Sequence, residues 1–209
     1  MPQRRTPGSL LLLALWLGGA GGLAAQGGVA GTYLLLPTSR LDVKTGKSGL
    51  FGFAGHEHLI RARLFEGQVE YDPARPEATT VRIVLRTDGL EVLTPPDTAE
   101  IRKVTAAMRR DVLHTDSFPE ITLVSRSVTA TAAGYRLVAE FTMHGQSREV
   151  TIPVSVVFRG DTLVATAAFA LKQTDFGIRP FRGGPGGTVR VADEVKFTID
   201  ARALPAGRP

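Results

Sequence analysis

Alternating apolar and polar residues dominate the chain from Thr32 onward, and this period of two constrains the fold more than any other feature. Successive side chains of a β-strand point to opposite faces, so such a segment buries one face and exposes the other. Short turns, such as Ala133-Gly134 and Gly160-Asp161, separate several of the alternating segments and predict antiparallel hairpins. The alternation is clearest over residues 81–86, 135–143, 150–158, 163–171 and 195–201.

Long antiparallel strands with one buried face close most economically into a barrel. We therefore predict an all-β fold, an antiparallel barrel, in one domain that spans residues 32–204 of the 209-residue chain. The chain contains no cysteine, which excludes disulfides, thiolate metal ligands and a lipidated cysteine. A domain of this size buries enough surface to be stable without disulfides.

One segment, residues 97–113, has the spacing of a helix instead, with Ile101, Val104, Met108 and Val112 on one face. Asp97, with Glu100 three residues later, predicts a capping box at its start. A lone amphipathic helix between barrel strands usually covers one mouth of the barrel, and we expect that position here. The opposite face is basic, which is typical of a solvated surface.

The first 25 residues have the three parts of a secretory signal peptide. Arg4 and Arg5 give a positive start, Leu10–Leu17 is an apolar run, and a Gly/Ala-rich stretch follows. The apolar run is shorter than the roughly 20 residues that a membrane-spanning helix needs. We expect cleavage after Ala24 or Ala25, and a mature protein that is periplasmic or secreted.

The mature chain is only mildly basic. Its formal charge falls from +5 to +3 because Arg4 and Arg5 are the only charged residues in the removed segment. This charge is far from the basic stripe of a nucleic-acid-binding protein, so no nucleic-acid partner is expected. It does allow a transient contact with an acidic membrane surface.

Several positions on the predicted inward faces carry small side chains, among them Ala139, Ala165 and Ala167. In a solid barrel these alanines would need bulky partners opposite them, because protein interiors pack to near-crystalline density. Mixed with Leu, Phe and Ile, they could instead line an apolar cavity, the usual ligand site of a barrel. The pattern leaves both alternatives open. The predicted lining of such a cavity is Met108, Leu137, Ala139, Phe141, Ile152, Val154, Ala165, Ala167 and Phe169.

A succession of short motifs resembles the YceI-like family, the bacterial polyisoprenoid-binding, lipocalin-like barrels of the periplasm. The motifs are a segment ending in His58, then GQVEYDP (67–73), FPEIT (118–122), FTMHGQS (141–147) and TDFGI (174–178). Their order and spacing carry the resemblance, which runs from about Ser39 to Leu204.

The resemblance implies a lipocalin-like antiparallel barrel of about eight strands whose tunnel takes a long isoprenoid or a similar amphiphile. We therefore expect an exported barrel that binds or carries a long apolar lipid and has no cofactor besides that ligand. The oligomeric state is left open, a homodimer included.

His56-Glu57-His58 is a second functional candidate. The segment is predicted as a strand, and histidines two apart on a strand share a face, so both could contact a ligand head group at the barrel mouth. They could also hold a metal if His114, His144 or a carboxylate completed the set, in a metal-binding or redox-associated protein. A purely structural role is the third alternative. No Gly-x-Ser-x-Gly motif or other catalytic constellation occurs, so an enzyme is not expected.

The signal peptide predicts the mature N-terminus. We expect exported protein to begin at Ala25 or Gln26, because the small residues before these positions suit signal peptidase. N-terminal sequencing of the exported protein measures this directly. Exported material that begins at Met1 would contradict the assignment.

Overall fold

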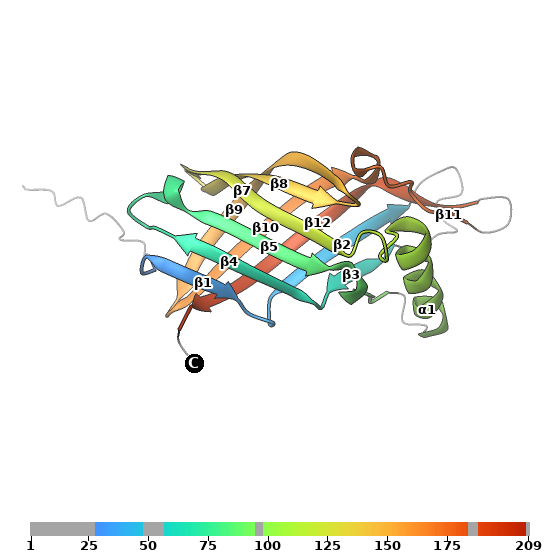
Figure 1. The fold of residues 1–209 in the computed structure, drawn as a ribbon, viewed down its shortest axis with the longest axis horizontal. Coiled ribbons are helices and arrows are strands. Elements are labelled where there is room, and N and C mark those ends of the chain that lie inside the picture. The colour runs from blue at the N-terminus through green and yellow to red at the C-terminus, as the bar shows by residue number, and fades with distance from the viewer. Residues whose placement is uncertain (1–27, 48–56, 95–97, 184–187, 208–209) are drawn as a thin grey trace, which may run out of the picture.

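The computed structural model describes residues 28–47, 57–94, 98–183 and 188–207, which form an elongated β-barrel with a helix at one end (Figure 1). Eight antiparallel strands make the closed barrel. In spatial order they are β1 (Gly31–Leu35), β4 (Phe65–Tyr71), β5 (Thr80–Arg86), β7 (Glu120–Thr131), β8 (Gly134–Met143), β9 (Gln146–Arg159), β10 (Thr162–Lys172) and β12 (Val189–Pro205). Pairing of β12 with β1 closes the ring. The predicted fold class is confirmed.

All five alternating segments lie in strands, and the apolar residues at alternate positions of each segment face inward. In β8, Leu137, Ala139, Phe141 and Met143 are each at most 7% exposed. Arg136, which directly precedes Leu137, lies exposed on the outer face. The period of two in the sequence therefore matches the inner and outer faces of the barrel.

Additional strands extend the sheet at the end of the barrel that carries the helix. There β12 also pairs with β2 (Arg40–Lys47), β2 with β3 (Leu59–Ala62), and β3 with β6 (Leu90–Val92). β11 (Arg182–Gly183) pairs with the start of β12. The connections include the 3₁₀ turns η2 (Pro76–Ala78), η3 (Thr87–Gly89) and η5 (Gln173–Phe176).

The helix α1 (Thr98–Ala107) continues into a π-helical turn, η4 (Met108–Val112), so the predicted helix is confirmed. The predicted cap, Asp97, lies outside the described residues. Met108 packs with Leu41 and Leu90, while Arg109 Nη2 donates to the backbone carbonyls of Asp88 and Leu90. These contacts hold the helix over the barrel mouth, as expected (Figure 1). Within the described ranges, no helix has the length and apolar character needed to cross a bilayer.

Met108 provides a test of the helix position. Its side chain is only 7% exposed and packs with Leu41 and Leu90, so Met108→Asp places a carboxylate among apolar side chains. We expect a loss in the free energy of unfolding of at least about 2 kcal/mol, measured by urea denaturation. Ala106→Asp, at an exposed position of the same helix, is the control and should change stability far less. An equal effect of both substitutions would mean that the helix does not seal the barrel.

Candidate functional site

An apolar cavity of about 800 Å³ lies inside the barrel. It extends from Ala99 and Lys103 of the helix, at one end, to Tyr71 and Tyr135 at the other. Its volume is in the range of small-molecule sites, which are typically about 300–1,000 Å³. The barrel is therefore hollow along its axis, which decides between the two alternatives that the alanines left open.

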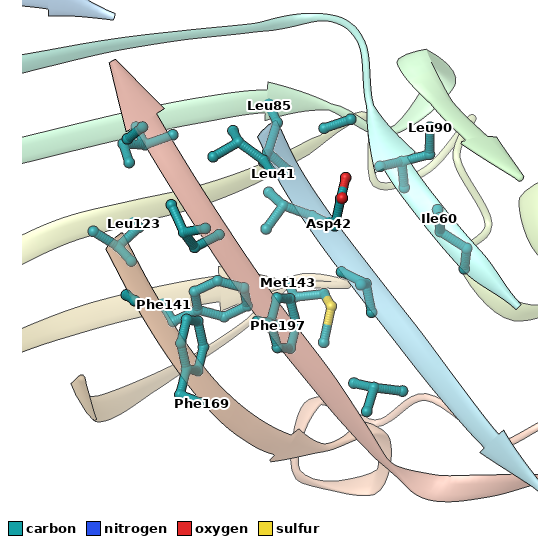
Figure 2. Close-up of a pocket in the computed structure, with 18 of the residues that line it drawn as sticks. Leu41, Asp42, Ile60, Leu85, Leu90, Leu123, Phe141, Met143, Phe169 and Phe197 are labelled. Carbon is teal, nitrogen blue, oxygen red and sulfur yellow. The ribbon is translucent and has the colours of Figure 1, made fainter. Parts of the chain in front are cut away.

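Two walls of different composition enclose the cavity. On one side the wall is aliphatic, with side chains from β2, β3, β5, β6 and β7, and on the other it carries Met143 and aromatic rings from β8, β10 and β12 (Figure 2). The labelled aliphatic residues are Leu41, Ile60, Leu85, Leu90 and Leu123, and the rings are Phe141, Phe169 and Phe197.

The aromatic wall is a packed cluster. Phe197 stacks on Phe169 with ring centroids 4.8 Å apart, and Phe141 meets Phe197 edge-on at 5.7 Å. Since β9 and β10 separate β8 from β12 in the sheet, the contact between Phe141 and Phe197 crosses the interior. Part of the barrel is therefore packed solid, and the cavity occupies the space beside these rings.

Eight of the nine predicted lining residues border this cavity: Met108, Leu137, Phe141, Ile152, Val154, Ala165, Ala167 and Phe169. The ninth, Ala139, does not border it, so its placement in the lining was wrong. Ala139 is completely buried in the packed cluster. Its methyl group is short, and its neighbours Leu137 and Phe141 reach further inward and form the wall instead. Contact between these eight residues and a ligand remains a prediction.

The mouth beside the helix is the more polar end of the cavity. Thr45, His58, Lys103, Gln173 and Arg190 all border it there. Gln173 Nε2 donates to the carbonyl of residue 192 at 2.8 Å, and the backbone N–H of His58 donates to Thr45 Oγ1 at 3.1 Å. These two hydrogen bonds fix the orientation of the Gln173 and Thr45 side chains. The mouth therefore offers ordered polar atoms next to an apolar interior.

An acidic group at the mouth is neutralised. Asp42 borders the cavity, and Arg61 donates to its two carboxylate oxygens through Nε and Nη2, both at 2.7 Å. The hydrogen bond to Asp42 raises the pKa of Arg61, although burial opposes this effect. The Asp42 carboxylate therefore adds no isolated negative charge to the mouth of the cavity.

The histidine candidates are only partly within the described chain. His58 precedes β3 and is not in a strand, so the prediction of a strand through it was wrong; its Nδ1 lies 2.7 Å from the backbone carbonyl of Thr94. The N–H of His58 donates to the Thr45 hydroxyl and the N–H of Leu59 to the Thr94 hydroxyl, so side-chain oxygens replace backbone acceptors where β3 begins. His56 lies outside the described residues.

The other two histidines contact each other near the helix end. His114 Nδ1 lies 3.0 Å from His144 Nε2, and the Phe118 ring packs on His144 with centroids 4.2 Å apart. Both histidines adopt left-handed backbone conformations, with φ of 47° and 52°. In the part of the chain that the structure describes, no three His, Asp or Glu side chains cluster closely enough to hold a metal ion.

The hydrogen-bond direction in this pair follows from its surroundings. His144 also bonds to the backbone of Phe176, an interaction that raises its pKa and so identifies His144 as the donor to the carbonyl. Because Nε2 faces His114, the nitrogen that donates is Nδ1, and neutral His144 accepts from His114 at Nε2. The pair thus links the segment after η4, the β8–β9 turn and η5.

Sequence reasoning missed most of the aliphatic wall. Ile60 and Leu90 come from β3 and β6, strands of four and three residues in which too few residues alternate to give a signal. Leu41 comes from the longer β2, whose alternation was not recognised. Ile83 and Leu85 lay in a recognised alternating segment and could have been added.

The sequence matches a known family over most of its length. The profile of the YceI-like domain matches residues 43–203. Among similar proteins, a UPF0312 protein of Pseudomonas putida is 29% identical over 136 residues, which are 62% of this chain and 66% of that protein. A UPF0312 protein of Yersinia enterocolitica is 26% identical over 97 residues, 46% of this chain and 47% of that protein. The chain thus spans about half to two thirds of these relatives.

Solved structures share the fold at low identity. BcnA of Burkholderia cenocepacia has a TM-score of 0.62 at 20% identity, with 79% of this chain and 96% of that chain covered. A polyisoprenoid-binding domain from Saccharophagus degradans has a TM-score of 0.56 at 11% identity, with 85% and 99% covered. At such identities the likeness establishes the barrel architecture alone.

The histidine pair predicts a pH effect on stability. Burial, and then the charge of His114, lower the pKa of His144 in the folded protein, against the opposing effect of the Phe176 bond. As the pH falls, the His144 imidazole is therefore protonated in the unfolded chain before it is protonated in the folded protein. The free energy of unfolding is highest above about pH 6.5 and decreases as the pH drops below that value. Asp111 is the acidic group whose charge interacts with His114.

His144→Asn should remove this part of the acid sensitivity, because asparagine tolerates a left-handed backbone and does not titrate. The measurement is the free energy of unfolding in urea at pH 7.5 and pH 5.0. His58→Asn is the control, and it should keep the difference between the two pH values. An unchanged pH dependence in His144→Asn would contradict the assignment.

Proposed function

Since the chain belongs to the YceI-like domain family, we propose that its barrel binds and carries a long apolar lipid of the isoprenoid type. The observation that carries this proposal is the cavity of about 800 Å³, whose wall is mostly aliphatic and aromatic. Burying apolar ligand surface there contributes about 25 cal/mol per Å² removed from water. The S. degradans neighbour, a polyisoprenoid-binding domain, supports the same ligand class.

The distribution of polar groups supports an orientation for the ligand. Thr45, Gln173 and Lys103 border the mouth beside the helix, whereas the aliphatic and aromatic wall continues inward. An amphiphile would place its polar end among these side chains, where it keeps hydrogen bonds, and its chain in the interior. Lys103 would add attraction if that polar end is anionic.

Binding and transport, with no chemical conversion, suit the composition of the wall. The Leu, Ile, Val, Ala, Met and Phe side chains that make up most of the wall give contact and exclude water, but they are neither acids, bases nor nucleophiles. The protein would act outside the cytoplasm, an inference that rests on residues 1–25 and their signal-peptide pattern. Mass spectrometry of organic extracts from the purified mature protein would identify a co-purified chain.

Ala167 tests the proposal by mutation. Its methyl group borders the cavity, so Ala167→Phe, alone or with Ala165→Leu, should fill ligand volume. We expect the variant to fold with nearly unchanged stability and to lose retention of the long-chain ligand. Ala168→Phe is the matched control, because the neighbouring Ala168 lies exposed on the outer face and should leave retention intact.

Two measurements decide the outcome: the thermal midpoint and the amount of lipid in the extract. A folded Ala167→Phe variant without lipid supports the carrier. If the interior were already full, the same substitution would cost about 1–3 kcal/mol by overpacking. A destabilised variant from a parent that never carried lipid would therefore refute the proposal.

A further inference from the structure

The end of the barrel opposite the helix is filled by aromatic rings. Tyr33 of β1 meets Tyr71 of β4 edge-on at 6.1 Å between ring centroids. Phe158 of β9 lies 5.9 Å from Tyr33 and 5.1 Å from Tyr71. Tyr135, at the start of β8, also borders the cavity at this end and interacts with Tyr71.

The strand order shows that these contacts cross the interior. In the sheet, β10 and β12 separate β9 from β1, and β5, β7 and β8 separate β9 from β4. Phe158 therefore reaches Tyr33 and Tyr71 through the lumen and not along the wall. The three rings close the barrel from within.

The chain segment before β1 covers these rings. The Tyr33 hydroxyl donates to the backbone carbonyl of Val29 at 2.8 Å, and Tyr33 is only 2% exposed. The backbone at Gly28 lies directly on Phe158, since a Cβ there would come within 2.0 Å of its ring. Any larger residue at position 28 would require the Phe158 ring to shift, so glycine permits this close approach, and residues 28 and 29 cover the aromatic closure.

The inner surface of the closure is neutral. Tyr71 and Tyr135 border the cavity, and burial, followed by the interaction with Tyr135, raises the pKa of Tyr71 to about 12. The phenol therefore stays protonated at physiological pH. An apolar chain end can pack against these rings, whereas a charged end would find no counter-ion in them.

We propose that Tyr71 and Tyr135 determine the length of ligand that the barrel accepts, because the apolar end of the chain stops against their rings. This inference rests on the proposed function. The mouth beside the helix holds the polar end, and the rings, fixed by Tyr33, Phe158 and the covering segment, form the stop. The ligand class is thus a linear amphiphile of limited length with an uncharged distal end.

A series of straight-chain primary alcohols tests the proposal in the wild-type protein. Each added methylene that enters the cavity should strengthen binding about fourfold. Dissociation constants, measured by displacement of the apolar fluorophore 1-N-phenylnaphthylamine, should therefore fall with chain length up to a break point and then stop falling. Affinity that continues to rise past all tested lengths would overturn the inference. If neither the fluorophore nor any alcohol binds, the proposed function itself fails.

Variants of Tyr71 locate the stop. Tyr71→Ala removes a ring of six carbons, so the break point should move to chains longer by about two carbons or more. Tyr71→Val is the second variant, should the alanine variant fold poorly. Tyr71→Phe is the matched control: it keeps the ring and should keep the break point. Folded Ala and Val variants with the wild-type break point would overturn the inference.

A crosslinking measurement needs no variant. A long-chain alcohol with a diazirine at its distal end is bound to the wild-type protein and irradiated, and the labelled peptides are identified by mass spectrometry. We expect labelling at Tyr71, Tyr135 or Phe158. Labelling confined to residues 99–108 of the helix segment would mean that the chain enters in the opposite direction and that the rings are not its stop.

Discussion

The pairing of β12 with β1 is the interaction on which the rest of the structure depends. Only three residue pairs join the two strands, from Tyr33 with Pro205 to Leu35 with Ala203, yet they turn an open sheet into a ring. An eight-stranded ring has an interior just wide enough to be filled by side chains or to hold one small ligand. Closure therefore creates the choice between a solid core and a cavity.

The aromatic rings on the inner faces fill one part of the barrel interior and leave another part open. Phe141 and Phe197 touch across the interior and pack one side of it, while the aliphatic wall opposite leaves space. At the two ends the barrel is closed by different chemistry. A helix and ordered polar side chains lie at one end, and Tyr33, Tyr71 and Phe158 lie at the other. The cavity is consequently polar at one end and aromatic at the other, which gives a bound amphiphile a direction.

Much of the fold could be predicted from the sequence because its signals are local. A period of two over nine or more residues, as in 135–143, predicts a strand and its inner face without knowledge of its neighbours. The spacing of Ile101, Val104 and Met108 likewise predicted the helix. The prediction was weakest where elements are short. A four-residue strand such as β3 carries too little periodicity, and His58 was wrongly included in a strand.

The sequence by itself determined the all-β class, the inward residues of the long strands and the amphipathic helix, since each depends on side-chain order along one segment. Tertiary structure alone decided which inward residues border empty space. Ala139 and Ala167 follow the same alternating pattern. Ala139 is covered by Leu137 and Phe141, which extend further into the barrel, whereas Ala167 borders the cavity. It also decided that Phe158 meets Tyr33 and that His114 meets His144. Such contacts join residues far apart in the chain, and their distances follow only from how the closed sheet curves and which strands come to face each other across it.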